Sequence, residues 1–166
     1  MNWYRKALNT KKLDWDKIHS DFNYHTQQIL SGKKPAGHFD YIINDQYNYT
    51  NYPQILDFVK LVKSTRPDLS VYYVEQIQKD NMKVKAYVIG KDPACISIVE
   101  GIRRLTHQGF HDNKAHELFG KGVGYTPEEI KEFVAKTDAD RNQVELEKQW
   151  AEEHSEVEPK LIVKKI

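Results

Sequence analysis

The sequence has almost no cysteine and no long apolar run. Its 166 residues include a single cysteine, Cys95, so no disulfide can form within the chain. Cys95 stands among apolar residues, a setting typical of a buried and unreactive thiol. No apolar run reaches roughly 18 residues, the length at which a segment can begin to cross a bilayer, and the polar start of the chain lacks a signal-peptide core. We therefore expect a cytoplasmic protein with no membrane partner.

A dominant charge of one sign is also missing. The chain has 25 lysines and arginines against 24 acidic residues, which gives a formal net charge of +1. Such a balance provides no long-range field that would draw the chain to nucleic acid or to an anionic membrane. Hydrophobic residues make up 39% of the chain, which is enough to build a core. The ten tyrosines suit half-buried surfaces and interfaces, because the ring packs while the hydroxyl stays in water.

Two neighbouring segments predict a β-hairpin. Residues 69–77 are β-prone, and in residues 82–89 apolar side chains alternate with polar ones, which is the period of a strand. The short connector between them contains Asp80 and Asn81, which favour a turn. Residues 38–43 are a further strand candidate. We expect an α+β fold with a small antiparallel sheet centred on the 69–77 and 82–89 hairpin, which residues 38–43 could extend.

Helical periodicity predicts the layers that cover this sheet. Apolar residues recur at helical spacing in segments 13–30, 53–64 and 93–108. Asp92 is predicted to be the N-cap of the third segment, with Pro93 in its first turn. Gly109 is well placed to end that helix in a left-handed conformation.

Two more helices follow. Asp112 is predicted to cap a helix over 113–120, which the glycines at 120, 122 and 124 should end. Thr126 and Glu129 have the spacing of a capping box, so a helix should begin at Pro127. We expect residues 1–137 to form one α+β domain and residues 138–166 to form a C-terminal helical extension and tail. The last seven residues, KLIVKKI, predict either an edge strand or a disordered tail.

Histidines concentrate between residues 107 and 117. Imidazole and carboxylate groups bind transition metals and transfer protons near neutral pH. The candidate metal ligands are His107, His111, His116 and Glu117. A structural role for the histidines, metal binding and acid–base catalysis are the three interpretations that the spacing leaves open, since no known metal or catalytic motif matches it.

Two further groups are candidate binding residues. Tyr47, Tyr49 and Tyr52 stand among asparagines, a composition that suits recognition of other molecules. Lys83, Lys85 and Arg103 could bind phosphate groups if the hairpin and the following helix share an open face. The alternatives are a solvated loop for the tyrosines and a solvated, edge-protecting set of charges for the basic residues.

Two short segments resemble parts of known protein groups. Residues 109–120, GFHDNKAHELFG, resemble a helical motif of small uncharacterised bacterial proteins with the pattern G-hydrophobic-x-x-H-E-A-x-H-x-x-G. Asn113 and Lys114 occupy the region where the first histidine of that motif would lie. The start, MNWYRKA, resembles the N-termini of uncharacterised proteins from phages and mobile elements. These resemblances imply a bacterial or phage origin and no particular activity.

The sequence therefore favours a non-enzymatic interaction protein that associates with a protein partner or with itself and needs no cofactor. The first alternative is a metal-dependent hydrolase or nuclease that uses a divalent metal at the histidine cluster. The second alternative is nucleic-acid binding through the hairpin lysines.

Overall fold

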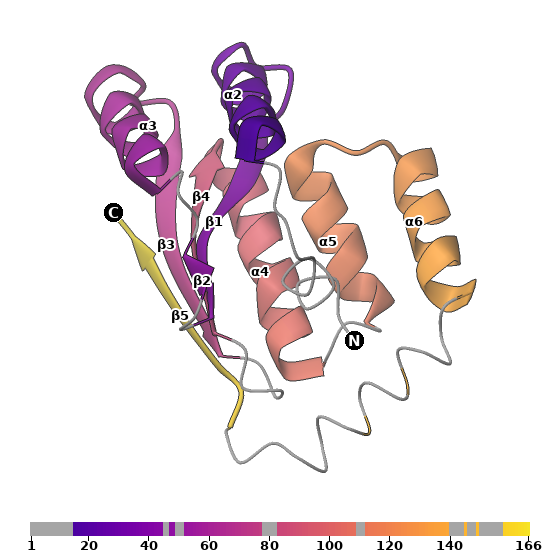
Figure 1. The fold of residues 1–166 in the computed structure, drawn as a ribbon. Helices are drawn as coiled ribbons and strands as arrows, with labels where there is room; N and C mark the ends of the chain where they lie inside the picture. Colours follow the sequence, from indigo (N-terminus) through magenta and orange to yellow (C-terminus); the bar gives the residue numbers. More distant parts are fainter. Residues whose placement is uncertain are drawn as a thin grey trace.

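The computed structural model has an α+β architecture, as the sequence predicted (Figure 1). It describes residues 15–44, 47–48, 52–77, 83–108, 112–139, 145, 149 and 158–166. The helices are α2 (Trp15–Leu30), α3 (Tyr52–Thr65), α4 (Asp92–Gln108), α5 (Asn113–Val123) and α6 (Pro127–Ala139). The strands are β1 (Ala36–Asn44), β2 (Tyr47–Asn48), β3 (Ser70–Ile77), β4 (Lys83–Gly90) and β5 (Lys160–Lys165).

The strands form one sheet in the order β2-β1-β4-β3-β5, and each neighbouring pair is antiparallel. The predicted hairpin is present as β3 and β4, with a continuous register from Ser70 opposite Gly90 to Ile77 opposite Lys83. The third predicted strand is also present, and β1 extends it at both ends. Of the two alternatives for the chain end, the edge strand is the one observed, because β5 pairs with β3. The end of the chain therefore belongs to the sheet.

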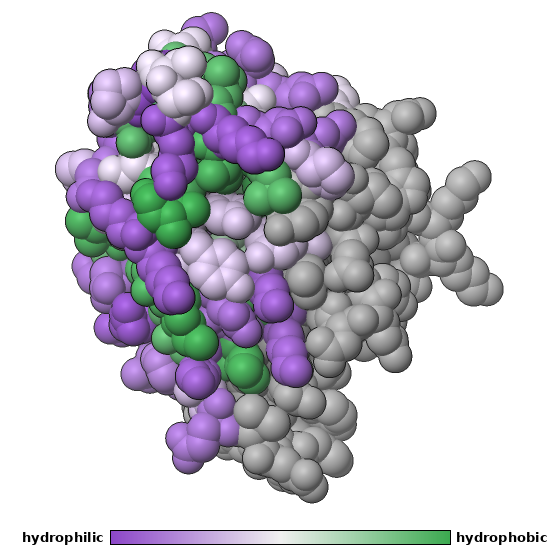
Figure 2. Space-filling model, turned by 90° about the vertical axis from the view of Figure 1, so that its left-hand side faces the viewer, coloured by the Kyte–Doolittle hydropathy of each residue, from purple (hydrophilic) through white to green (hydrophobic). Residues whose placement is uncertain are grey.

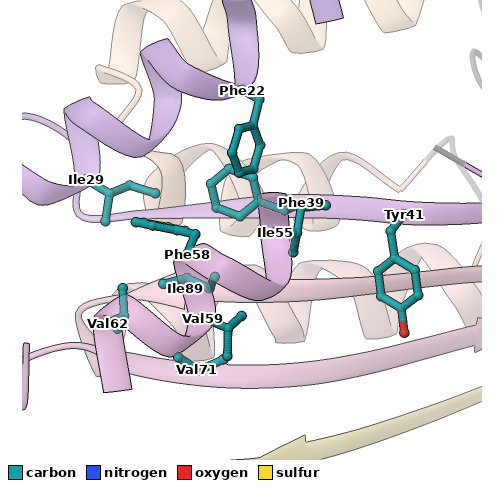
Figure 3. Packing of buried hydrophobic residues seen from close by; sticks show 10 residues of the cluster. All are labelled: Phe22, Ile29, Phe39, Tyr41, Ile55, Phe58, Val59, Val62, Val71 and Ile89. Atoms are coloured by element: carbon teal, nitrogen blue, oxygen red, sulfur yellow. The ribbon is translucent and has the colours of Figure 1, made fainter. Parts of the chain in front are cut away.

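Helices cover both faces of the sheet. On one face, α2 and α3 pack on β1, β3 and β4 around a buried aromatic group, in which the rings of Phe22, Phe39 and Phe58 meet edge to face (Figure 3). On the other face, α4 and α5 pack on β3, β4 and β5 through Ile98, Val123 and their neighbours. Strand alternation explains the division, since Val88 belongs to one cluster and its neighbour Ile89 to the other.

Glycines let α4 and α5 approach closely, and this corrects the predicted end of α5. Gly120 and Gly122 were expected to stop the helix, but they lie inside it, and Gly124 ends it with a φ of 88°. A Cβ at Gly122 would lie 2.7 Å from the carbonyl oxygen of Ala94, and one at Gly101 would lie 2.9 Å from that of Ala115. These glycines therefore serve interhelical contact, which local sequence does not reveal.

Helix starts largely follow the sequence. The carboxylate of Asp112 accepts a hydrogen bond from the backbone N–H of Ala115, as expected of an N-cap. Thr126 and Glu129 exchange the two hydrogen bonds of a capping box, at 3.1 and 3.2 Å. At α4 the prediction is wrong by one residue: Asp92 already belongs to the helix, and the carbonyl of Lys91 accepts the hydrogen bond from Cys95. The carboxylate of Asp92 instead binds the hydroxyl of Tyr72 and the ammonium of Lys165.

Several predictions fall on residues that the structure does not describe. The hairpin turn at Asp80 and Asn81, the helix end at Gly109 and most of residues 138–157 lie outside the described ranges. Among the helices that are described, none combines the length and the apolar character needed to cross a bilayer.

Candidate functional site

One edge of β1 lies open between two helices. Within the described residues, the segment 36–41 of β1 has β4 on one side and no strand on the other, because β2 pairs only with Ile42 and Asn44. A cleft of about 290 Å³ follows this edge, and all residues from Ala36 to Asp40 line it. The helices α2 and α5 flank β1, one on each face of the sheet (Figure 1). Residues of α2, β1 and α5 all line the cleft, so it lies beside β1 and between these two helices.

The walls of the cleft are largely aromatic. Phe22 comes from α2, Phe39 from β1, Phe119 from α5 and Tyr125 from the turn after α5. The side chain of Tyr125 is 46% exposed at the cleft, whereas Phe22 and Phe39 are nearly buried. Apolar walls with a few polar groups are typical of binding sites.

A histidine and an aspartate from β1 form the first polar pair. His38 and Asp40 are two residues apart on a strand, so their side chains point to the same face, the one that α5 covers. Nε2 of His38 lies 2.9 Å from Oδ1 of Asp40, and these side chains are 11% and 13% exposed. The ring of His38 also meets the ring of Phe119 edge to face at 5.7 Å. The imidazole is therefore held in one orientation by a carboxylate and an aromatic ring.

A lysine and a histidine form the second polar pair. Nζ of Lys34, from the loop before β1, donates a hydrogen bond of 2.9 Å to Nδ1 of His25 on α2. An ammonium can only donate, so Nδ1 of His25 is unprotonated and its hydrogen is on Nε2. Burial lowers the pKa of Lys34, and burial followed by the charge of Lys34 lowers the pKa of His25. Perturbed titratable groups in a cleft are a mark of functional sites.

None of these four polar residues was predicted from the sequence to belong to a site. His38 and Asp40 could have been found, because a polar residue at every second position of an otherwise apolar strand signals a shared face. The pairing of Lys34 with His25 had no signal in the sequence, since the two residues are nine positions apart and the end of α2 lies between them.

The predicted metal ligands lie in different surroundings. His116 is 7% exposed, and its ring meets that of Phe133 on α6 at 5.0 Å. His107 is exposed and lines a groove of about 460 Å³ between α4 and α5. Glu117 lies 3.4 Å from the ammonium of Lys114, and His111 lies outside the described residues. Across the part of the chain that is described, no three histidine, cysteine or acidic side chains lie close enough together to hold a metal ion.

The predicted binding residues do not form one surface. Lys83 and Lys85 alternate along β4 with residues of the α4 face, so they point to the face of α2 and α3. Arg103 lies on α4, on the other side of the sheet, where it forms a 3.4 Å ion pair with Glu100. Tyr49 lies outside the described residues, and for Tyr47 and Tyr52 only the backbone is described, in β2 and at the start of α3.

Comparison of the chain with known protein families, with curated proteins and with solved structures gives no match.

Proposed function

We propose that this chain is a non-enzymatic binding protein that takes an extended peptide segment of a protein partner along the open edge of β1. The observation that carries the proposal is the position of the cleft directly beside residues 36–39 of β1, which pair with β4 on one side and with no described strand on the other. A peptide laid there can pair with the backbone of β1 as an added strand, which gives affinity without requiring a particular sequence.

The flanking helices favour a single strand as the ligand. Because α2 and α5 cover the two faces beside this edge, an intact second sheet cannot approach it, whereas one extended segment fits between them. At the other edge of the sheet, Lys160, Lys164 and Lys165 place like charges along β5, and charged side chains of this kind discourage a further strand from pairing with an edge. Of the two sheet edges, that of β1 is thus the better suited to accept a strand.

The side chains of the cleft suggest which peptides fit. The aromatic walls at Phe22, Phe119 and Tyr125 suit an apolar side chain, and Lys34 supplies a positive charge for a carboxylate. We therefore expect a segment in which an apolar residue lies next to an acidic residue or a C-terminal carboxylate. If that segment comes from a second copy of the chain, the self-association expected from the sequence follows.

A phage-displayed library of random linear peptides tests the proposal. Selection should enrich acidic sequences with an apolar residue, and the enriched peptide should shift the backbone amide resonances of residues 36–41. Lys34→Gln should weaken binding by roughly fivefold to a hundredfold, as expected when a charged partner is lost, whereas Lys33→Gln, at the exposed neighbouring lysine, should not. Failure to enrich any sequence, or resonance shifts confined to other strands, would contradict the proposal.

A further inference from the structure

A second surface lies on the face of α2 and α3, beyond the part of the sheet that these helices cover. The register defines it, because residues opposite one another in antiparallel strands point to the same side. Tyr87, Lys85 and Lys83 of β4 lie opposite Tyr73, Glu75 and Ile77 of β3. The same residues of β3 lie opposite Lys164, Ile162 and Lys160 of β5. We call these nine residues the open sheet face.

No described helix lies over the lower part of this face (Figure 1). The helices α2 and α3 gather at one end of the strands, around Phe58 and Val62. Tyr41, which is buried, lies farther along β1 than the side chains from these helices (Figure 3). Beside it the face continues with half-buried residues, Tyr73 and Glu75 on β3 and Lys85 and Tyr87 on β4.

The charge of the open sheet face is strongly positive. It carries four lysines and one acidic residue, Glu75, whereas the whole chain has a net charge of only +1. Glu75 already accepts a 3.0 Å hydrogen bond from the hydroxyl of Tyr73. Lys160 and Lys164 are exposed, and Lys83 and Lys85 are half-buried. Such a surface is complementary to a chain of phosphate groups.

Aromatic rings lie among these lysines in a fixed arrangement. The rings of Tyr73 and Tyr87 meet at 5.8 Å, and Tyr41 stacks on Tyr87 with a ring distance of 5.6 Å. Tyr73 and Tyr87 are half-buried, so part of each residue remains at the surface. Bases of a single strand can stack on such rings, whereas the bases of a duplex are stacked on one another and cannot.

The open sheet face lacks the character of a hydrophobic protein interface. On the side of the molecule that carries β5, hydrophobic side chains are broken up by hydrophilic ones in the part that is coloured (Figure 2). A pattern of single apolar residues between lysines suits a flexible, charged ligand better than a second folded core.

We infer that the open sheet face binds single-stranded nucleic acid, with phosphates on the lysines of β4 and β5 and bases on Tyr73 and Tyr87. This site is separate from the cleft beside β1, so either can exist without the other. Arg103, which the sequence suggested as a phosphate ligand together with Lys83 and Lys85, does not belong to this site, because the sheet lies between Arg103 and the two lysines.

Fluorescence anisotropy on the full chain tests this inference. The probes are a labelled oligodeoxythymidylate of about 15 nucleotides, near the upper site size of single-strand binders, and a duplex of the same length. The single strand should bind more tightly than the duplex, with affinity falling as salt rises. Changing Lys83 and Lys85 together to glutamine should reduce the slope of log affinity against log salt by about 1.4, or about 0.7 per lost phosphate contact.

Tyrosine variants separate stacking from charge. Tyr73→Leu should weaken binding about fivefold or more while leaving the salt slope unchanged, and Tyr73→Phe should bind as the unchanged protein does. The matched controls are Lys131→Gln with Lys136→Gln on α6, and Tyr24→Leu on α2, where the tyrosine is 58% exposed. Circular dichroism and thermal unfolding verify that each variant is folded.

Three results would overturn the inference. The first is no saturable binding of the single strand at low salt. The second is an equal loss of binding in the lysine control on α6. The third is binding to phosphatidylserine vesicles without binding to the oligonucleotide, which would assign the lysines to a lipid surface.

Discussion

Nε2 of Gln76 donates a hydrogen bond of 2.7 Å to Oγ1 of Thr106, and both residues are buried, at 5% and 1% exposure. Thr106 in turn donates to the carbonyl of Ile102 one turn earlier in α4. This polar contact ties β3 to α4 across an otherwise apolar layer. A buried polar group that loses its partner costs more than the hydrogen bond contributes, so the pair should behave as a unit.

Thr106→Val should lower the free energy of unfolding by about 1–3 kcal/mol, because the amide of Gln76 would be left buried without its acceptor. Gln76→Leu together with Thr106→Val should be less destabilising than the sum of the two single changes, since no unpaired polar group remains. Urea unfolding of the four proteins in this cycle measures the coupling. Strict additivity would mean that water or another group satisfies the amide.

Gly122→Ala should lower the free energy of unfolding by about 1–3 kcal/mol, as overpacked sites do. Its Cβ would lie 2.7 Å from the carbonyl oxygen of Ala94, in the backbone of α4, which cannot move aside cheaply. The loss should appear although alanine favours helix over glycine. Lys121→Ala, at the exposed neighbouring position, should change stability by less than about 0.5 kcal/mol. A stabilised Gly122→Ala variant would show that α5 can shift away from α4.

Acid stability should depend on Asp92. Its hydrogen bonds from Tyr72 and Lys165 lower the pKa of the carboxyl to about 2 from 3.8. The folded state therefore binds this proton less readily than the unfolded state. The contribution of the ionised Asp92 to the free energy of unfolding is present above pH 3.8 and disappears as the pH falls to about 2. Thermal unfolding between these pH values should be less steeply pH-dependent in Asp92→Asn. The exposed Asp57→Asn on α3 is the control and should follow the unchanged protein.

His25 should make the protein less stable in mild acid. Burial and the nearby ammonium of Lys34 hold the pKa of His25 below 6.5, so the unfolded state binds its proton more readily. The contribution of His25 to stability is complete above pH 6.5 and falls as the pH drops toward its folded pKa. As the pH falls from neutrality into mild acid, the melting temperature of His25→Gln should therefore fall less than that of the unchanged protein. The control His107→Gln, on the exposed end of α4, should keep the original pH dependence.

Local patterns in the sequence predicted most of the secondary structure. The alternation in residues 82–89 predicted β4, and the capping signals at Asp112 and Thr126 predicted where α5 and α6 begin. These signals succeed because a strand alternates its faces and a helix start needs acceptors within three residues. At Asp92 the same rule was off by one residue, because Tyr72 and Lys165 compete for the carboxylate.

The class of fold and the hairpin could thus be predicted from local patterns, since each follows from short-range periodicity. How distant segments combine could be learned only from the folded chain. The sheet pairs β5 with β3, Gly122 lies at the contact between α4 and α5, and the cleft with Lys34 and His25 follows an edge of β1 on which no described strand pairs with residues 36–39. These features depend on contacts between residues far apart in the chain, which no local period encodes.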